Sequence, residues 1–181
     1  RALDAVLKSY VPTALANLGD TGAVDLLTAH FGHPDTDLQV LRSLAIALGR
    51  LADMDSPAWK LLGQYVKEGR DVQTRHFALI ARAEIAARDA NADPDEHKAF
   101  VRELHDELDG DGKSQQHRPW AALAAAIWGR VPEHDSLDLL EHLRREYDDE
   151  SDPLVRGAFA VSLGLLRDRA SGDRLTTDFV E

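Results

Sequence analysis

A short phrase of small and aliphatic residues that closes on glycine or alanine recurs along the chain. Its clearest copies occupy residues 14–20, 44–49 and 159–164, and degenerate copies occupy residues 78–83 and 124–129. The closing positions Gly19, Gly49, Ala83, Gly129 and Gly164 are 30, 34, 46 and 35 residues apart. A repeat of about 36 residues is typical of stacked helical hairpins. The sequence therefore predicts an all-α protein, a right-handed solenoid of about five hairpins.

Prolines mark the helix starts, because a proline in the first turn loses no hydrogen bond. We expect each to lie at or just before a helix and none inside one: Pro12, Pro34, Pro57, Pro94, Pro119, Pro132 and Pro153. The predicted hairpins pair residues 12–18 with 21–31, 36–51 with 57–68, 71–88 with 95–108, 119–130 with 133–147, and 152–167 with 172–180. Residues 1–10 would be the second helix of an earlier pair. Glycines at the ends of the first helices would let the chain turn tightly.

Helical periodicity predicts which faces are buried. In 95–108 the apolar face consists of Phe100, Val101, Leu104 and Leu108. In 133–147 it consists of Leu137, Leu140, Leu143 or Arg144, and Tyr147. The tryptophans Trp59, Trp120 and Trp128 occupy apolar positions of predicted helices, so we expect them in the core.

The segment 152–164, DPLVRGAFAVSLG, resembles the first helix of HEAT repeats, with an Asp-Pro start, a Val-Arg pair and a Leu-Gly ending. Residues 71–83 match the same frame, with alanine at the glycine position. This resemblance to the HEAT-repeat family, including its PBS-lyase-type members, covers nearly the whole chain. It implies a scaffold that recognises proteins along a curved surface lined by the second helices.

Charge suggests which partner such a surface binds. The net charge is −11 and the pI is about 5.1, which disfavours nucleic acid as a partner. Residues 95–109 carry six acidic side chains against two basic ones, and residues 133–150 carry eight against two. We expect a basic protein or peptide to bind there. The candidate binding residues are His97, Arg102, Asp106, Asp138, Glu141 and Arg145. The alternative is that these charges are merely solvated.

Metal motifs are incomplete in the sequence, and we expect no cofactor. HEAT-like di-iron hydroxylases carry His-Glu after the arginine of the first helix, whereas this chain has His76-Phe77 and Gly157-Ala158 there. His30 and His33 flank a predicted turn and lack further zinc ligands. Residues 107–112 resemble a calcium loop, but Arg118 stands where its bidentate glutamate belongs.

No phosphate-binding glycine loop or nucleophile elbow occurs in the sequence. We therefore expect a non-enzymatic scaffold or interaction module. Two alternatives stay open: a HEAT-like enzyme or ligand carrier of the bilin-lyase type, and a structural spacer in a larger repeat protein. An alkylpurine glycosylase, another enzyme on a similar fold, would need a basic groove for DNA.

Composition leaves the cellular compartment open. The chain has no cysteine, which is compatible with the cytosol, slightly favoured here, and with export. Its apolar runs are too short to span a bilayer. The chain begins at Arg1 rather than methionine, and its last helix has only Leu175, Phe179 and Val180 as large apolar anchors. We expect one repeat domain over residues 1–181, a fragment of a longer array that self-associates through its exposed end repeats.

Overall fold

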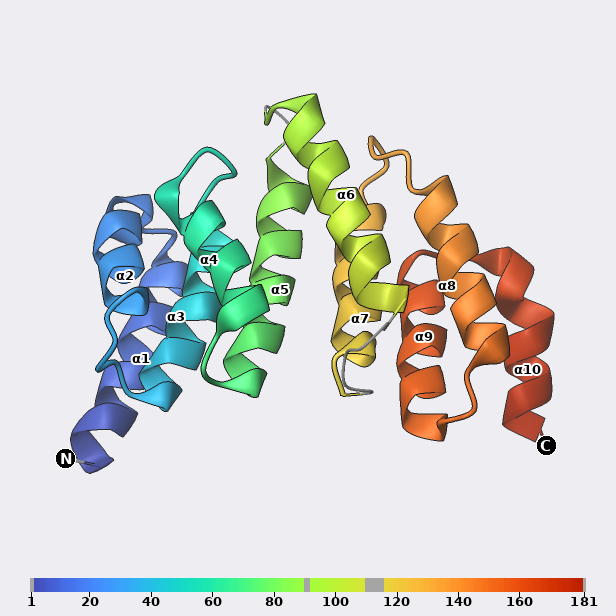
Figure 1. Ribbon diagram of the computed structural model, residues 1–181, viewed down its shortest axis with the longest axis horizontal. Helices are drawn as coiled ribbons and strands as arrows, with labels where there is room; N and C mark the ends of the chain where they lie inside the picture. The colour runs from blue at the N-terminus through green and yellow to red at the C-terminus, as the bar shows by residue number, and fades with distance from the viewer. Residues whose placement is uncertain (1, 90–91, 110–115, 181) are drawn as a thin grey trace. The chain divides into compact units, whose positions relative to one another are not determined.

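The computed structural model describes residues 2–89, 92–109 and 116–180, and within these residues every regular element is a helix (Figure 1). This confirms the predicted all-α class. The α-helices are α1 (Ala2–Leu18), α2 (Val24–Phe31), α3 (Leu38–Leu51), α4 (Pro57–Glu68), α5 (Val72–Arg88), α6 (Pro94–Asp109), α7 (Arg118–Gly129), α8 (Leu137–Asp149), α9 (Pro153–Leu165) and α10 (Gly172–Val180). Short 3-10 helices at Thr21–Ala23 and Arg169–Ser171 precede α2 and α10. None of the described helices is long and apolar enough to cross a bilayer.

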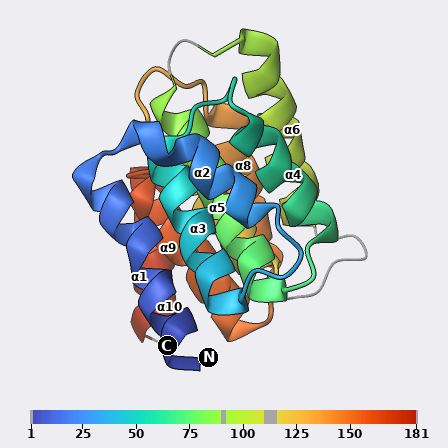
Figure 2. The ribbon, with the colours of Figure 1, turned by 90° about the vertical axis from the view of Figure 1, so that its left-hand side faces the viewer.

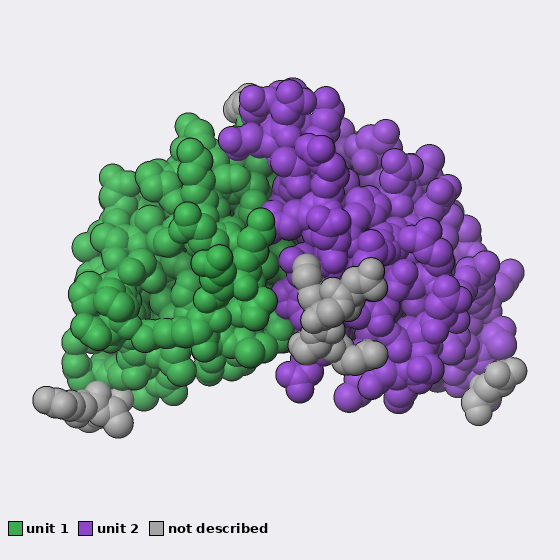
Figure 3. All heavy atoms as spheres, in the orientation of Figure 1, with its two compact units in different colours: residues 1–92 green, residues 93–181 purple. Residues whose placement is uncertain are grey.

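The chain divides into two compact units, Arg1–Ala92 and Asp93–Glu181 (Figure 3). In the first unit α3 packs between α1 and α5. The helices α2 and α4 contact each other and cover one side of this row, α2 on α3 and α4 on α5 (Figures 1 and 2). The unit is therefore a two-layer helical stack with its core between the layers.

The second unit has the same layered plan. α7 packs on α9 in one layer, and α6 contacts α8 in the other. In this layer each helix packs chiefly on the helix that follows it in the chain, α6 on α7 and α8 on α9, as α2 and α4 do in the first unit. The predicted hairpins paired each of these helices with the helix before it, so the observed pairing is shifted by one helix. For example, α8 contacts α7, its predicted partner, less extensively than it contacts α9.

Local sequence signals explain most helix starts. Asp37, Asp71 and Asp152 precede α3, α5 and α9, and their carboxylates accept backbone N–H groups of the first turn. Pro57 and Pro153 are the first residues of α4 and α9. Helix bounds therefore agree with the prediction to within a few residues, except at α1 and α8.

The predicted break at Pro12 was wrong, because α1 runs continuously through this residue. A proline inside a helix cannot bond to the carbonyl four residues earlier, here that of Lys8. The proline is buried, and α1 packs along α3. Ser43 of α3 donates its hydroxyl to the backbone carbonyl of Ser9 beside the interruption. Tertiary packing and this bond thus offset the local preference for a break.

The expected helix start at Pro132 was also wrong. Pro132 lies in a turn in which the His134 ring donates Nδ1–H to the Trp128 carbonyl at 2.8 Å, and α8 begins only at Leu137. Leu137 is 57% exposed rather than in the core. The buried face of α8 consists of Leu139, His142, Leu143 and Tyr147. On α6 the prediction was closer, since Phe100, Leu104 and Leu108 are buried and Val101 is partly exposed.

The last helix is held by polar contacts instead of the three expected apolar anchors. Phe179 and Val180 are 92% and 78% exposed, and only Leu175 is partly covered. Arg174 pairs with Asp148 at 2.5 Å. Asp178 pairs with Arg156 at 2.7 Å and accepts the Tyr147 hydroxyl. Ion pairs therefore replace burial at α10.

Two aspartates each cap a helix and bind an arginine from another element. Asp71 accepts the Thr74 N–H at the start of α5 and two bonds from Arg42 of α3, each 2.9 Å. Asp168 accepts the Ala170 N–H and two bonds from Arg144 of α8, at 2.8 and 2.5 Å. The arginine bond is the largest cause that lowers the pKa of Asp71 well below its usual range, and that of Asp168 to about 2.

One glycine has the predicted turning role and another does not. Gly19 ends α1 with φ +69°, and Asp20 N–H bonds to the Leu15 carbonyl. Gly49 lies inside α3, where an added Cβ would be 2.7 Å from the Cα of Ala81. Its role is therefore close helix packing.

The turn after α9 repeats the turn after α1, with arginine in place of glycine. Arg167 has φ 57°, and Asp168 N–H bonds to the Leu163 carbonyl. A residue with a Cβ is strained in this left-handed conformation. The two turns thus share a backbone pattern and differ in strain.

Replacing Arg167 by glycine is expected to raise the free energy of unfolding by about 0.5–1 kcal/mol, because it relieves this strain. The exposed Arg167 side chain has no salt bridge among the described residues. Urea unfolding of wild type and Arg167→Gly measures the change. Gly19→Ala is the matched control and should lose about 1 kcal/mol. A destabilised Arg167→Gly variant would contradict the strain.

Asp168 also makes stability depend on pH. Its folded pKa of about 2 lies below the unfolded value of about 3.9, so its contribution is complete above pH 4 and is lost as the pH falls toward 2. The stability difference between wild type and Asp168→Asn should shrink by about 2 kcal/mol from pH 5 to pH 2. Urea unfolding at a series of pH values measures it. A constant difference for Asp168→Asn would contradict the lowered pKa of Asp168.

Candidate functional site

The six candidate binding residues lie on two adjacent helices of the second unit. His97, Arg102 and Asp106 belong to α6, whereas Asp138, Glu141 and Arg145 belong to α8. All are exposed except His97, which is half-buried. Since α6 and α8 contact each other, the exposed five lie on a pair of adjacent helices and are called the α6–α8 surface below.

Carboxylates from both helices converge on His105. Burial and the charge of His142 lower the pKa of His105, whereas Asp109, Asp138 and Asp106 act in the opposite direction. This electrostatic effect shows that Asp106 and Asp138 lie near the same ring. The structure therefore brings these two predicted residues together, one from each helix.

The acidic side chains of the surface are not held in salt bridges among the described residues, although Glu141 acts electrostatically on Arg144. Asp106, Asp138 and Glu141 form no salt bridge in the ranges the structure describes. The Arg102 side chain turns to the Lys98 carbonyl, 3.4 Å away, and Arg145 lies 3.9 Å from Glu146. The surface thus keeps a local excess of negative charge.

His97 belongs to a different local cluster. Its ring centroid lies 5.4 Å from that of His134, which in turn stacks on Trp128 at 4.3 Å with a 19° angle between the planes. Burial lowers the pKa of His134. Trp128 and Trp59 are core residues as predicted, and Trp120 is half-buried.

Sequence reasoning missed a histidine and carboxylate cluster at the C-terminal half of α6. The Nδ1 atoms of His105 and His142 are 2.7 Å apart, and the rings stack with an 11° angle. The Nε2 atom of His142 lies 2.9 Å from Asp109 Oδ1 and 3.4 Å from Glu146 Oε1. The signal was present, because each predicted helix has a histidine four residues before an acid.

An arginine orients one side of this cluster. Arg118, at the start of α7, binds Glu146 at 2.6 Å and Glu150 at 2.5 Å, and its Nε donates to the Leu108 carbonyl. Next to it, buried Glu107 lies 2.6 Å from His117. The calcium-like loop considered at 107–112 lies partly outside the described residues.

Other candidate ligands are placed separately. His76 is buried in α5. His33 lies in a turn, where its Nδ1 accepts the Asp35 N–H. Asp109, His142 and Glu146 are the group among the described residues whose ligand atoms could hold one metal ion.

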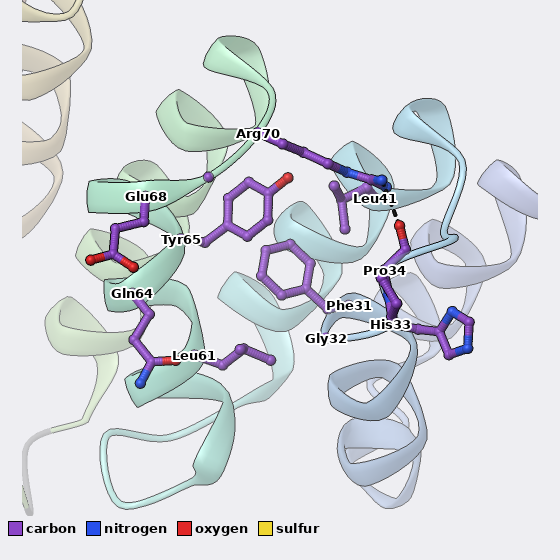
Figure 4. Close-up of a pocket in the computed structure, with 11 residues that line it drawn as sticks. Phe31, Gly32, His33, Pro34, Leu41, Leu61, Gln64, Tyr65, Glu68 and Arg70 are labelled. Carbon is purple, nitrogen blue, oxygen red and sulfur yellow. Dashed lines mark hydrogen bonds between the residues drawn. The ribbon is translucent and has the colours of Figure 1, made fainter.

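The first unit contains a pocket of about 290 Å³ where the end of α2 meets α4 (Figure 4). Phe31 and Tyr65 both line it and pack against each other, with ring centroids 5.0 Å apart. Arg70 reaches over to the Pro34 carbonyl at 2.5 Å, whereas His33 points away. The pocket therefore combines aromatic walls with a guanidinium rim.

A second hollow of about 850 Å³ lies in the other unit, at the ends of α7 and α9. Arg130 and Arg167 contribute cationic side chains to its lining. The two hollows could each accept a small molecule by shape.

Comparison with known proteins gave no match: no protein-family model, no curated protein and no solved structure is similar to this chain.

Gly69 maintains the wall of the first pocket. A Cβ at this position would overlap the Tyr65 ring and backbone oxygen. Gly69→Ala should destabilise the protein by about 1–3 kcal/mol and displace Tyr65, because packed sites tolerate added atoms poorly. Thermal unfolding and the Tyr65 ring resonances measure these effects.

Gly157→Ala is the control, since an added Cβ meets nothing within 4 Å in α9. It should be neutral or stabilising by up to about 1 kcal/mol. Equal effects of the two substitutions would contradict the packing role of Gly69.

Proposed function

We propose that this protein is a non-catalytic interaction module that binds a basic protein segment on the α6–α8 surface. The observation that carries the proposal is the group of exposed carboxylates without salt bridges, Asp106, Asp138 and Glu141. The resemblance to HEAT repeats supports a scaffold role, because such repeats present extended surfaces to partners.

Electrostatics favours a lysine- or arginine-rich segment as the partner. Carboxylates on two neighbouring helices can contact successive basic side chains while water still covers their other oxygens. Such exposed charges contribute chiefly to the association rate and to specificity. Binding should therefore weaken strongly as salt is raised.

Reversing Asp138 and Glu141 to lysine tests the surface directly. The double variant should bind a lysine- and arginine-rich peptide at least about tenfold more weakly, because it replaces attraction with repulsion. Its stability should change by no more than about 0.5 kcal/mol, as expected for exposed sites. Fluorescence anisotropy at low and high salt measures affinity, and urea unfolding measures stability.

Asp53 and Asp55 provide a matched control. They lie exposed in the turn before α4 of the other unit and form no salt bridge with described residues. Their double reversal changes net charge by the same amount and should change affinity much less. Equal losses would mean that only total charge matters, and unchanged binding by the Asp138 and Glu141 variant would refute the proposed surface.

A second candidate function is a small-molecule carrier of the bilin-lyase type. The pocket lined by Phe31 and Tyr65, with Arg70 at its rim, favours it. Native mass spectrometry of purified protein tests this alternative. A retained small molecule that is lost in Gly69→Ala would support the carrier, whereas peptide binding without any retained molecule favours the interaction module.

Self-association is a further proposed property. Leu7, Tyr10 and Val11 of α1 are 61%, 68% and 54% exposed, and α10 exposes Phe179 and Val180. These apolar side chains could pack against a second copy or against further repeats. The spacer role in a longer array rests on the same side chains.

A further inference from the structure

We propose that Asp109, His142 and Glu146 form a binding site for a divalent transition metal, with Zn²⁺ as the reference ion. This inference concerns a different group of side chains from the proposed peptide surface and does not depend on it. Each helix contributes a matched pair one turn apart, His105 with Asp109 on α6 and His142 with Glu146 on α8. Residues four apart lie on the same helix face, so both pairs can point at one place.

The buried histidine lacks a hydrogen bond at the atom that faces the carboxylates. The His142 side chain is 4% exposed, and its Nε2 has no partner with hydrogen-bond geometry. Asp109 and Glu146 nevertheless place oxygens 2.9 and 3.4 Å from it. Close approach without the geometry of a hydrogen bond is the arrangement expected of ligands around a common ion.

The distances of both carboxylates from His142 match those between ligands in a coordination sphere. Zinc binds imidazole nitrogen and carboxylate oxygen at about 2.0–2.2 Å. Two ligands at such distances are roughly 2.9 Å apart at a right angle and roughly 3.4 Å apart at a tetrahedral angle. The ligand atoms of Asp109, His142 and Glu146 all lie within 4.8 Å of one another. A small adjustment of exposed Asp109 could therefore complete the site.

Local charge also favours a dication. Arg118 binds Glu146 and Glu150 at once. With Asp109, these three carboxylates exceed the one guanidinium by two negative charges. Among the described residues Arg145, 62% exposed and 3.9 Å from Glu146, is a further cation and can turn into solvent. A bound divalent ion would balance the remaining charge.

His105 is placed to select the metal-binding tautomer of His142. The two Nδ1 atoms share one hydrogen bond of 2.7 Å. When His142 donates this proton, its Nε2 carries a lone pair directed at the carboxylates. Metal-bound histidines usually donate their other ring N–H in this way, which fixes the ring.

The ligand set predicts selectivity. One imidazole and two carboxylates suit zinc and cobalt, whereas magnesium and calcium prefer oxygen ligands throughout. Asp109 is 53% exposed, so the open coordination position faces solvent on its side and can take water.

Titration of the full chain with ZnCl2 and with CoCl2 tests the site, using calorimetry for zinc and visible absorption for cobalt. Asp109→Asn should weaken binding by about tenfold or more, because it removes a charged ligand. Asp55→Asn, exposed in the turn before α4 of the other unit, should leave affinity unchanged. Magnesium should not compete.

Nuclear magnetic resonance of the His142 imidazole gives a second readout that does not rely on a variant of the buried residue. Zinc should shift the Nε2 resonance of His142 and leave Nδ1 protonated. Binding of equal affinity in Asp109→Asn and Glu146→Gln, or zinc binding without any shift at His142, would overturn the site. Failure of zinc to bind at all would likewise overturn it.

Discussion

Close approach between helices of the same layer, α3 with α5 and α7 with α9, sets the helix spacing within each unit. At Gly49 of α3 an added Cβ would lie 2.7 Å from the backbone of Ala81 in α5. In α7, alanines at 121, 122, 124, 125 and 126 are fully buried. Each alanine buries little apolar area, so close contact gains dispersion energy over many atoms but little transfer energy per residue. Helices packed in this way need directional contacts to fix how they slide along one another.

Arginines supply many of those contacts. Arg88 donates to the carbonyls of Gly49 and Ala52 at the end of α3, and Arg75 donates to the Val66 carbonyl in α4. Carbonyls at helix ends lack partners in their own helix, and cations are favoured there. Arg42 and Arg144 form salt bridges with the aspartates that cap helices, Asp71 and Asp168. These arginines act within the units, and Asp106, Asp138 and Glu141 on the α6–α8 surface form no salt bridge among the described residues.

Helix type and most helix ends could be predicted from local signals. Asp-Pro at the start of α9 and glycine after α1 act through local backbone geometry, so their effect can be predicted from the sequence. Pro12 was misjudged because burial and a bond from Ser43, a residue far along the chain, override its local effect. The left-handed conformation of Arg167 could not be predicted for a similar reason, since its positive φ follows from the turn and not from the preference of arginine.

The candidate site likewise has features that could be predicted from the sequence and features that could not. Periodicity identifies exposed Asp106, Asp138 and Glu141, because it reports which side of one helix is polar. It cannot report the axial register between α6 and α8, and the meeting of His105 with His142 depends on that register. The burial of His142 was missed because the predicted face of α8 was derived with Leu137 in the core, whereas the actual face turns His142 inward.

His105 links the two charged features of the second unit. Its ring bonds to His142, and the exposed Asp106 and Asp138 act on it electrostatically. A cation held by His142 would lie within one Debye length, about 8–10 Å at physiological salt, of any carboxylate in contact with that ring. It would lower the negative potential that attracts a basic segment. By reciprocity, a bound basic segment would disfavour the cation by the same free energy. In an electrostatic link, the bound ion therefore weakens peptide binding. If the ion instead acted by fixing α6 against α8, it would strengthen peptide binding. The sign of the coupling distinguishes these two effects.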